Sequence, residues 1–120
     1  MTKRIYDIVP VPKPRMTKSD KWKTRPATAR YWAYKDECRL KGVELALNGD
    51  HITFIMPMPK SWSKKKKLEY EWQPHQQKPD WDNLAKGLYD AVYDEDSLVW
   101  DARVTKLWGK EGQIIIEGME

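Results

Sequence analysis

Residues 82–117 read DNLAKGLYDAVYDEDSLVWDARVTKLWGKEGQIIIE, and this stretch decides the fold class. Its first part has apolar residues at the i, i+4, i+7, i+8 spacing of an amphipathic helix: Leu84, Leu88, Ala91 and Val92. Apolar and polar residues then alternate through 98–105, which indicates a half-buried strand. The GKEG sequence at 109–112 favours a hairpin turn, and 113–117 favours a final strand. A helix followed by two strands therefore ends the chain.

The preceding residues predict three more elements. Ile5 to Val9 resembles a short strand that the proline-rich residues 10–14 terminate. An amphipathic helix is expected from Thr28, a possible N-cap, to a stop at Asn48-Gly49. The β-branched and aromatic residues 51–56 favour a strand, and 60–79 an exposed, mobile loop with a possible helical turn at 64–71. We expect one α/β domain over residues 1–120, with a small mixed sheet and two main helices in β-α-β-α-β-β order.

Length and composition exclude several classes of protein. The 120 residues suit one domain, and no apolar run approaches the roughly 20 residues that cross a bilayer, so we expect no membrane association. Charges near the N-terminus argue against a signal peptide, and a single cysteine excludes an internal disulfide and a cysteine-rich zinc site. We therefore expect a cytoplasmic protein. Scattered glycines and only two histidines disfavour a nucleotide-binding loop, a histidine-rich zinc site and a histidine-based triad.

The net charge of +4 is unevenly distributed along the chain. Residues 1–30 carry a net charge of +7 and residues 60–79 a net charge of +4, whereas residues 80–120 carry −6. The acidic part has the apolar periodicity described above, so its acids belong to folded structure and not to a solvated tail.

Two carboxylates lie close together in Lys78-Pro79-Asp80-Trp81-Asp82. If the extended backbone before Pro79 continues through Asp82, the Asp80 and Asp82 side chains project from the same side. Two such carboxylates suit a divalent cation that prefers oxygen ligands, and Mg²⁺ is the natural occupant. Lys86 follows Asp82 by four residues, so its ammonium would lie beside the metal site and could stabilise a phosphate or an oxyanion.

A second acidic cluster, Asp94-Glu95-Asp96, follows the predicted helix. One of its carboxylates could complete a three-acid metal site. Each of these acids also has a structural interpretation. Asp80 or Asp82 could cap the helix, Asp82, Lys86 and Asp90 could form surface pairs, and the second cluster could be a solvated turn.

Lysines and arginines surround these acids in the sequence. They are interleaved with Trp22, Trp62 and Trp72, as expected for phosphate contacts combined with base stacking. Solubilising loops would give the same pattern, but basic segments on both sides of an acidic site would also offset its repulsion of a polyanion. The candidate DNA-binding residues are Lys13, Arg15, Lys18, Lys64, Lys65, Lys66, Lys67 and Lys78.

The spacing Asp80-Trp81-Asp82-Asn83-Leu84-x-Lys86-x-x-x-Asp90-Ala91, followed by Asp94-Glu95-Asp96-x-x-Val99 and then Lys106, resembles the RusA family of Holliday-junction resolvases. Pro10-x-Pro12-Lys13-Pro14-Arg15 is similar to its phage and prophage branch. The resemblance implies that Asp80, Asp82 and Asp96 bind Mg²⁺ and that Lys86 assists catalysis. Family members commonly have two adjacent acids in the turn and use the second; this chain has three, which leaves Glu95 as the alternative to Asp96.

We therefore predict a Mg²⁺-dependent endonuclease that binds four-way DNA junctions as a homodimer and nicks two strands symmetrically. A junction has near two-fold symmetry, so paired nicks call for two related sites. The alternative is a non-catalytic DNA-binding accessory protein of recombination or replication, in which the acids serve only the fold. A glycosidase with a carboxylate pair is a third and weaker possibility.

Overall fold

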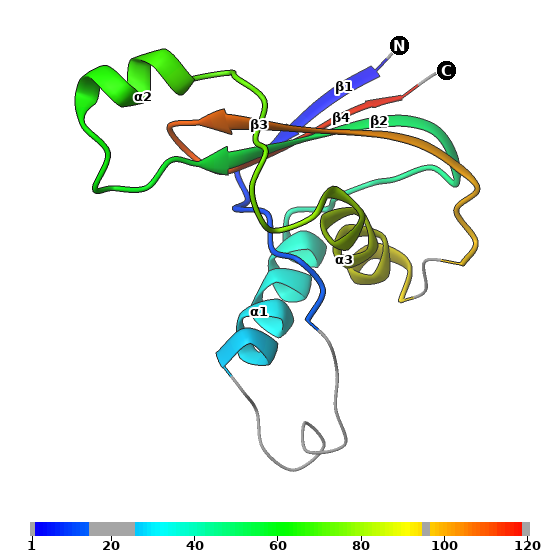
Figure 1. Cartoon of the computed structure of the whole chain (residues 1–120). Helices are drawn as coiled ribbons and strands as arrows, with labels where there is room; N and C mark the ends of the chain where they lie inside the picture. The colour runs from blue at the N-terminus through cyan, green and yellow to red at the C-terminus, as the bar shows by residue number, and fades with distance from the viewer. Residues whose placement is uncertain (1, 15–25, 95–96, 119–120) are drawn as a thin grey trace.

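The computed structural model describes residues 2–14, 26–94 and 97–118 (Figure 1). The elements in chain order are β1 (Thr2–Tyr6), α1 (Pro26–Leu40), β2 (Asn48–Pro57), α2 (Lys64–Tyr70), α3 (Trp81–Tyr93), β3 (Asp101–Gly109) and β4 (Gln113–Gly118). This is the predicted α/β domain with a mixed sheet and two main helices, to which the short helix α2 is added. None of the described helices is long and apolar enough to cross a membrane.

The sheet has the strand order β1-β4-β2-β3. β4 lies between β1 and β2 and is antiparallel to both, whereas β2 and β3 are parallel. The parallel pair requires a crossover connection, which contains α2 and α3. The predicted strand at 51–56 lies within β2, which confirms it. The turn at 109–112 does join β3 to β4, but the predicted hairpin is wrong, because β2 lies between these two strands and pairs with each of them.

Helices α1 and α3 lie against one face of the sheet (Figure 1). Alternate strand residues face them, because side chains of a strand point to opposite faces in turn. Ile52 pairs with Ile116 and Phe54 with Ile114, and all four are fully buried. From α3, Leu84, Leu88 and Ala91 enter the same core, as the helical periodicity predicts. This packing fixes α3 rigidly beneath the sheet.

Helix α1 ends much earlier than its predicted stop at Asn48-Gly49, which is therefore wrong. Gly42 has a φ of 65°, its N–H donates to Arg39 O, and the N–H of Val43 donates to Cys38 O. This pair of hydrogen bonds is a Schellman motif, which terminates a helix where glycine adopts the left-handed conformation. Leu45, assigned to the helix because of its spacing, is buried in the connection to β2 instead.

Two strand boundaries also differ from prediction. β1 covers Thr2–Tyr6 and not 5–9, because Ile8 has already left the sheet and enters the core from the following loop. β3 begins at Asp101, and the apolar residues Leu98 and Trp100, predicted to start this strand, are exposed before it. Alternation in the sequence identified a strand here but not its first residue.

The region 60–79 was predicted to be a mobile loop with a possible helical turn. The turn is confirmed as α2, which Ser63 caps by accepting a hydrogen bond from the N–H of Lys66. The rest is not a free loop. Trp72, Gln73 and His75 hydrogen-bond through their backbone to Trp108 and Lys106 of β3, along the outer edge of the sheet. This edge pairing holds the chain close to β3 just before it enters α3.

Candidate functional site

The two aspartates of the predicted metal site lie at the N-terminal end of α3. Asp80 is the N-cap residue and has an extended backbone, whereas Asp82 lies in the first helical turn. The extended conformation therefore does not continue through Asp82 as predicted, and the start of the helix brings the two residues together instead. Asp80 thus occupies the N-cap position that the structural interpretation allows, but its side chain makes no capping hydrogen bond.

Both aspartates line a cavity of about 840 Å³ between the start of α3 and the end of the 60–79 region. The other residues that line it are Gln76, Gln77, Lys78, Trp81 and Lys106. The carboxylates are about half exposed, at 48% for Asp80 and 49% for Asp82. Trp81 is also exposed, so the cavity offers a flat aromatic surface beside the acids.

Each carboxylate has a lysine beside it. The Lys78 ammonium donates to both oxygens of Asp80, at 2.9 and 3.1 Å. Lys86 Nζ lies 3.9 Å from Asp82 Oδ2, which confirms the predicted placement of this lysine one turn after the aspartate. These contacts are exposed, so they contribute little to stability. Their arrangement places two cations and two anions around one open space.

A third lysine reaches the cavity from the sheet. Lys106 is on β3, and its Nζ donates hydrogen bonds to the carbonyls of Gln77 and Pro79 at 2.8 and 2.7 Å. Burial lowers the pKa of Lys106, nearby Asp80 opposes this effect, and Lys78 adds to it. Lys106 is the last residue of the motif that resembles the RusA family, where it has no assigned role. One feature of the sequence could have identified Lys106 as a site residue. It lies between Val104 and Trp108, at a position where a strand with one buried face would normally have an apolar residue.

The donor set suits a hard divalent cation. Mg²⁺ binds carboxylate oxygens and is often held by one or two carboxylates together with waters and substrate phosphates. Asp80 and Asp82 supply such a pair in an open cavity that has room for further oxygen ligands. Within residues 2–14, 26–94 and 97–118, no group of three or more His, Cys, Asp or Glu side chains has the geometry of a metal site.

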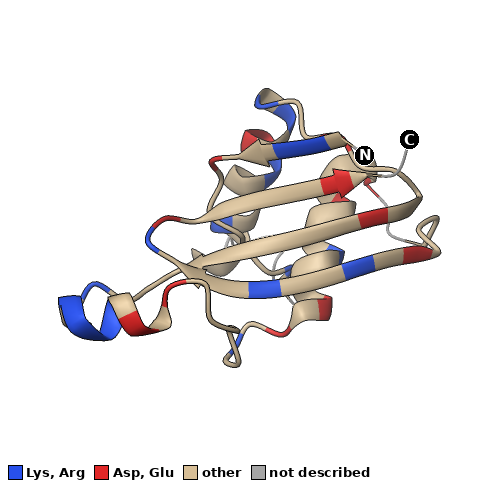
Figure 2. Cartoon of the chain, turned by 90° about the horizontal axis from the view of Figure 1, so that it is seen from above, with Lys and Arg blue, Asp and Glu red and all other residues tan. Residues whose placement is uncertain are grey.

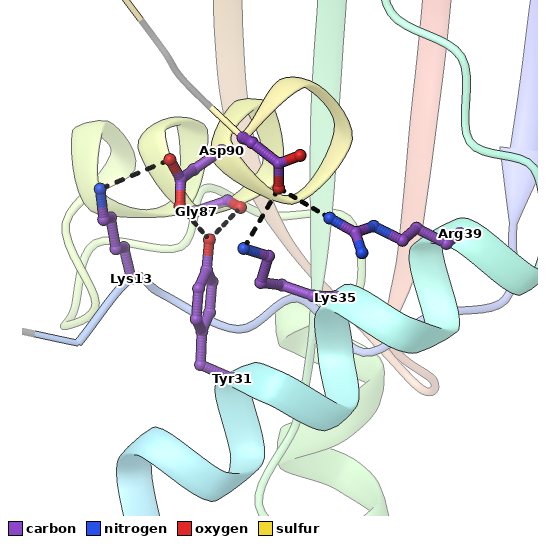
Figure 3. A network of polar contacts seen from close by, with 7 residues as sticks. Lys13, Tyr31, Lys35, Arg39, Gly87 and Asp90 are labelled. Carbon is purple, nitrogen blue, oxygen red and sulfur yellow. Dashed lines mark hydrogen bonds and ion pairs between the residues drawn. The ribbon is translucent and has the colours of Figure 1, made fainter. Parts of the chain in front are cut away.

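The other acidic cluster begins at the opposite end of α3. Asp94 is the C-cap of this helix, and thirteen helical residues separate it from Asp80, a distance of about 20 Å. Its carboxylate is bound by α1: Arg39 Nη2 lies 2.7 Å and Lys35 Nζ 3.5 Å from Oδ1 (Figure 3). Asp94 therefore contributes to the contact between α1 and α3. The predicted ligand Asp96 and its alternative Glu95 lie outside the described residues.

Asp90 also belongs to the contact between α1 and α3. The Tyr31 hydroxyl of α1 lies 2.8 Å from Gly87 O and 3.2 Å from Asp90 Oδ2, and Lys13 Nζ lies 3.7 Å from Asp90 Oδ1 (Figure 3). Burial, with the charge of Asp90 as a second cause, raises the pKa of Tyr31. The suggested surface pair of Asp90 with Lys86 is not formed, since Asp90 pairs with Lys13 instead.

The proline-rich segment places Lys13 at this position. Its chain passes so close to α3 that a Cβ on Gly87 would lie 2.9 Å from Val11 O and 3.0 Å from Lys13 N. The N–H of Lys13 donates to Asn83 O of α3 at 3.2 Å. Lys13, a candidate DNA-binding residue, is thus attached to the same helix that carries the two aspartates. Arg15 and Lys18 lie outside the described part of the chain.

The remaining candidate cations are exposed. Lys64, Lys65, Lys66 and Lys67 form most of α2, which extends beyond the sheet (Figure 2). Among the residues that the structure describes, none of these four lysines has a carboxylate within ion-pair distance. Lys66 Nζ lies over the Trp62 ring, 4.2 Å from its centroid. A cavity of about 470 Å³ beside α2 is lined by Met58, Lys64, Lys67, Leu68 and Lys110.

Comparison with known proteins identifies relatives of this chain. A model of the family described as "Endodeoxyribonuclease RusA" matches residues 6–117. The uncharacterized protein YqaN of Bacillus subtilis (strain 168) is 41% identical over an alignment of 71 residues, and the match covers 52% of this chain. The matched region is 50% of YqaN, so the chain spans about half the length of this relative. Because the family model covers nearly all of the described fold and both cavity aspartates, the chain belongs to the RusA endodeoxyribonuclease family.

Proposed function

We propose that this protein is a Mg²⁺-dependent endonuclease that cuts four-way DNA junctions. The observation that supports this proposal most directly is the pair of carboxylates, Asp80 and Asp82. They share a cavity with Lys78 and Lys106, and Lys86 lies beside Asp82. Membership in the family agrees with a nuclease. The metal, the junction and the pairing of nicks rest on the chemistry of these residues and on the family resemblance.

The residues of the cavity have distinct proposed roles. Asp80 and Asp82 hold the cation, which, when bound, would activate a water and stabilise charge on the scissile phosphate. Lys78 and Lys86 neutralise the carboxylates in the free protein. Once these carboxylates have a divalent partner, the two ammonium groups become available to phosphate oxygens. Lys86 then stabilises charge that develops in the transition state.

A third carboxylate is assigned by resemblance to Asp96, with Glu95 as the alternative. Asp94 is not a substitute, because its carboxylate is already paired with Arg39 and Lys35 of α1. Asp96→Asn and Glu95→Gln test the assignment by calorimetric titration of Mg²⁺. A lost or weakened binding isotherm for one variant identifies the ligand, and unchanged isotherms for both leave Asp80 and Asp82 as the protein's carboxylate ligands.

We propose that α2 contacts the phosphate backbone outside the cavity. Its four lysines have no acidic partner in the described structure, so their charge is available to a polyanion. Two exposed tryptophans offer stacking surfaces to unpaired bases: Trp72 and Trp81, which precede and follow residues 73–79 in sequence. Lys78, another of the candidate DNA-binding residues, lines the cavity and would contact a phosphate there.

The central experiment is a nicking assay on a synthetic four-way junction, with a linear duplex of the same sequence as control. We expect Mg²⁺-dependent nicks in the junction and no nicking with EDTA. Asp82→Asn should abolish nicking and keep or strengthen junction binding, since it removes a negative charge beside phosphate. Junction binding without any nicking by the wild type would instead support the DNA-binding accessory protein.

The α2 lysines are tested in the same system by binding alone. Replacing Lys64 to Lys67 together by alanine should weaken junction binding and reduce the slope of log affinity against log salt, because fewer counterions are released. Replacing the same four residues by arginine keeps the charge and should keep the slope. An unchanged slope in the alanine variant would place α2 away from the DNA.

We also propose a homodimer, because two symmetric nicks in one junction require two related sites. Analytical ultracentrifugation of the free protein tests the oligomeric state, and a cruciform plasmid tests the pairing of nicks. Release of linear plasmid in one binding event supports paired nicking, whereas accumulation of nicked circles contradicts it.

A further inference from the structure

Lys106 occupies a position that is unusual for a lysine. Its strand neighbours on the same face, Val104 and Trp108, pack against or belong to the hydrophobic core beneath the sheet. Lysine is rarely buried among such residues unless its ammonium has partners. Here the partners are two backbone carbonyls, of Gln77 and Pro79, that are separated by only one residue.

These two hydrogen bonds complete the attachment of residues 72–79 to β3. The N–H of Trp72 donates to Trp108 O, and the N–H of His75 donates to Lys106 O at 3.0 Å. Beyond His75, the described structure contains no backbone hydrogen bond from residues 76–79 to the sheet. The Lys106 side chain is therefore the last link between β3 and the chain before Asp80.

The two aspartates are consequently held in different ways. Asp82 belongs to the first turn of α3, whose Leu84 and Leu88 are fully buried, so core packing fixes its position. Asp80 is the N-cap residue: its carbonyl accepts a hydrogen bond from the N–H of Leu84 at 3.2 Å, but its side chain makes no capping bond. Its backbone follows directly from Pro79, whose carbonyl accepts a hydrogen bond from Lys106. The separation between the two carboxylates thus depends on Lys106 on one side and on the core on the other.

We propose that Lys106 is a positioning residue that sets the placement of Asp80 relative to Asp82 by hydrogen-bonding the carbonyls of Gln77 and Pro79. This inference rests on the proposed function, since the placement matters because the two carboxylates hold one cation. Two of the three ammonium protons satisfy the carbonyls, and the third remains directed toward the cavity side or solvent. The role differs from that of Lys86, which contacts a carboxylate itself.

Lys106→Met separates positioning from simple electrostatics, because the two effects have opposite signs. Methionine has a similar length but donates no hydrogen bond and has no charge. Removing a cation near two carboxylates would by itself tighten Mg²⁺ binding. Loss of positioning would weaken it, and we expect the Mg²⁺ dissociation constant, measured by calorimetry without DNA, to rise about tenfold, as for other residues that orient a metal ligand.

Two further variants provide the controls. Lys106→Arg keeps the charge and can donate to both carbonyls, so its Mg²⁺ affinity should lie within a fewfold of wild type. Arg103→Met removes a cation from an exposed position of the same strand and should leave the affinity unchanged. Mg²⁺ binding by Lys106→Met that is unchanged or tighter would overturn the proposal. If Lys106→Met does not fold, Lys106→Gln, which keeps one donor, is measured instead, with an intermediate loss expected and an unchanged affinity overturning the proposal.

Hydrogen–deuterium exchange measures the attachment itself, without metal, DNA or activity. The reporter is the His75 amide, which donates to Lys106 O in the last backbone hydrogen bond to β3 before Asp80. In Lys106→Met we expect this amide to exchange faster, because the chain that follows it is no longer held to β3, and we expect unchanged exchange in β2 and β4. Unchanged exchange at His75 would overturn the proposal even if nicking were lost. Failure of the wild type to bind Mg²⁺ would contradict the proposed function, and faster exchange at His75 would still support the attachment.

Discussion

The two ends of α3 contain the same kinds of residue in opposite surroundings. At the C-terminal end, Asp90 and Asp94 interact with Tyr31, Lys35 and Arg39 of the neighbouring helix α1 (Figure 3). At the N-terminal end, Asp80 and Asp82 form ion pairs with Lys78 and Lys86, which are near them in sequence. The first set joins two helices, and the second set surrounds a cavity.

The aspartates at the two ends of α3 also differ in side-chain burial. The Asp90 side chain is 16% exposed and accepts a hydrogen bond from a buried hydroxyl, whereas the Asp80 and Asp82 side chains are about half exposed. Asp94 is exposed but binds two cations of α1. Charges that join separate elements stabilise the fold, whereas charges gathered at an open cavity without such a partner remain available to a ligand. The comparison predicts different results for similar substitutions at the two ends.

Matched substitutions of Asp80 and Asp94 should give the largest contrast. Asp80→Asn removes one charge from the metal site, so we expect nicking of a junction to fall by about 10³-fold, at the upper end of losses seen for one electrostatic group. Asp94→Asn should leave nicking within a fewfold of wild type. Thermal melting of both variants verifies folding, and Asp80→Asn should melt near wild type because Asp80 makes no capping bond. Equal effects of the two substitutions on nicking would remove the functional distinction.

Lys86→Ala should give the next largest effect. As a surface partner of Asp82 this lysine contributes only about 0.2–0.5 kcal/mol to the helix. As a cation that stabilises the transition state, its removal should lower the single-turnover rate on a pre-bound junction by about 10²-fold, with binding little changed. A near-normal rate together with a slightly lower melting temperature would assign Lys86 to the helix surface alone.

Tyr31→Phe tests the C-terminal end of α3 through stability. The substitution removes the hydroxyl that donates to the Gly87 carbonyl and to Asp90, although each acceptor keeps another partner: the helical N–H of Ala91 and the Lys13 ammonium. We expect the free energy of unfolding, measured with urea, to fall by about 0.5–1.5 kcal/mol. Nicking at a temperature where the variant is folded should be unchanged. A loss of nicking without a loss of stability would connect this contact to the reaction.

Arg39→Ala should have the smallest effect. Arg39 and Asp94 are both largely exposed, and Lys35 remains near Asp94 after the substitution. We expect a loss below about 1 kcal/mol, which high salt should reduce further. Urea unfolding at low and high salt measures it. A larger, salt-independent loss would indicate that this ion pair is central to the packing of α1 on α3.

Local sequence patterns predicted the elements whose signals lie within a few residues. The apolar spacing of 84–92 predicted α3, the β-branched run at 51–56 predicted β2, and two glycines around Lys110 and Glu111 predicted a turn. They did not predict that β2 lies between the two strands that this turn joins. The same locality placed Asp80, Asp82 and Lys86 together, because a helix start and an i, i+4 spacing are enough to do so. The stop of α1 at Gly42 is also a local signal, but only Asn48-Gly49 was considered as a helix stop.

Contacts between distant residues were not predictable in this way. The sequence shows acids on both sides of α3, but only the packing of α1 determines that Asp94 is bound by Arg39, 55 residues earlier in the chain. Residues 60–79 have no periodicity, yet their last part pairs with the edge of β3 because an open strand edge has unpaired N–H and C=O groups.

The sequence by itself determined the α/β class, helix α3 and the pair of aspartates at its start, since propensity and periodicity act over one or two turns. The tertiary structure decided which acids and lysines are engaged in the fold and which face the cavity. Lys106 illustrates the reason: its hydrogen bonds to Gln77 and Pro79 span 29 and 27 residues. Only the packing of the complete chain brings such residues within 3 Å of each other, so no local pattern can specify the contact.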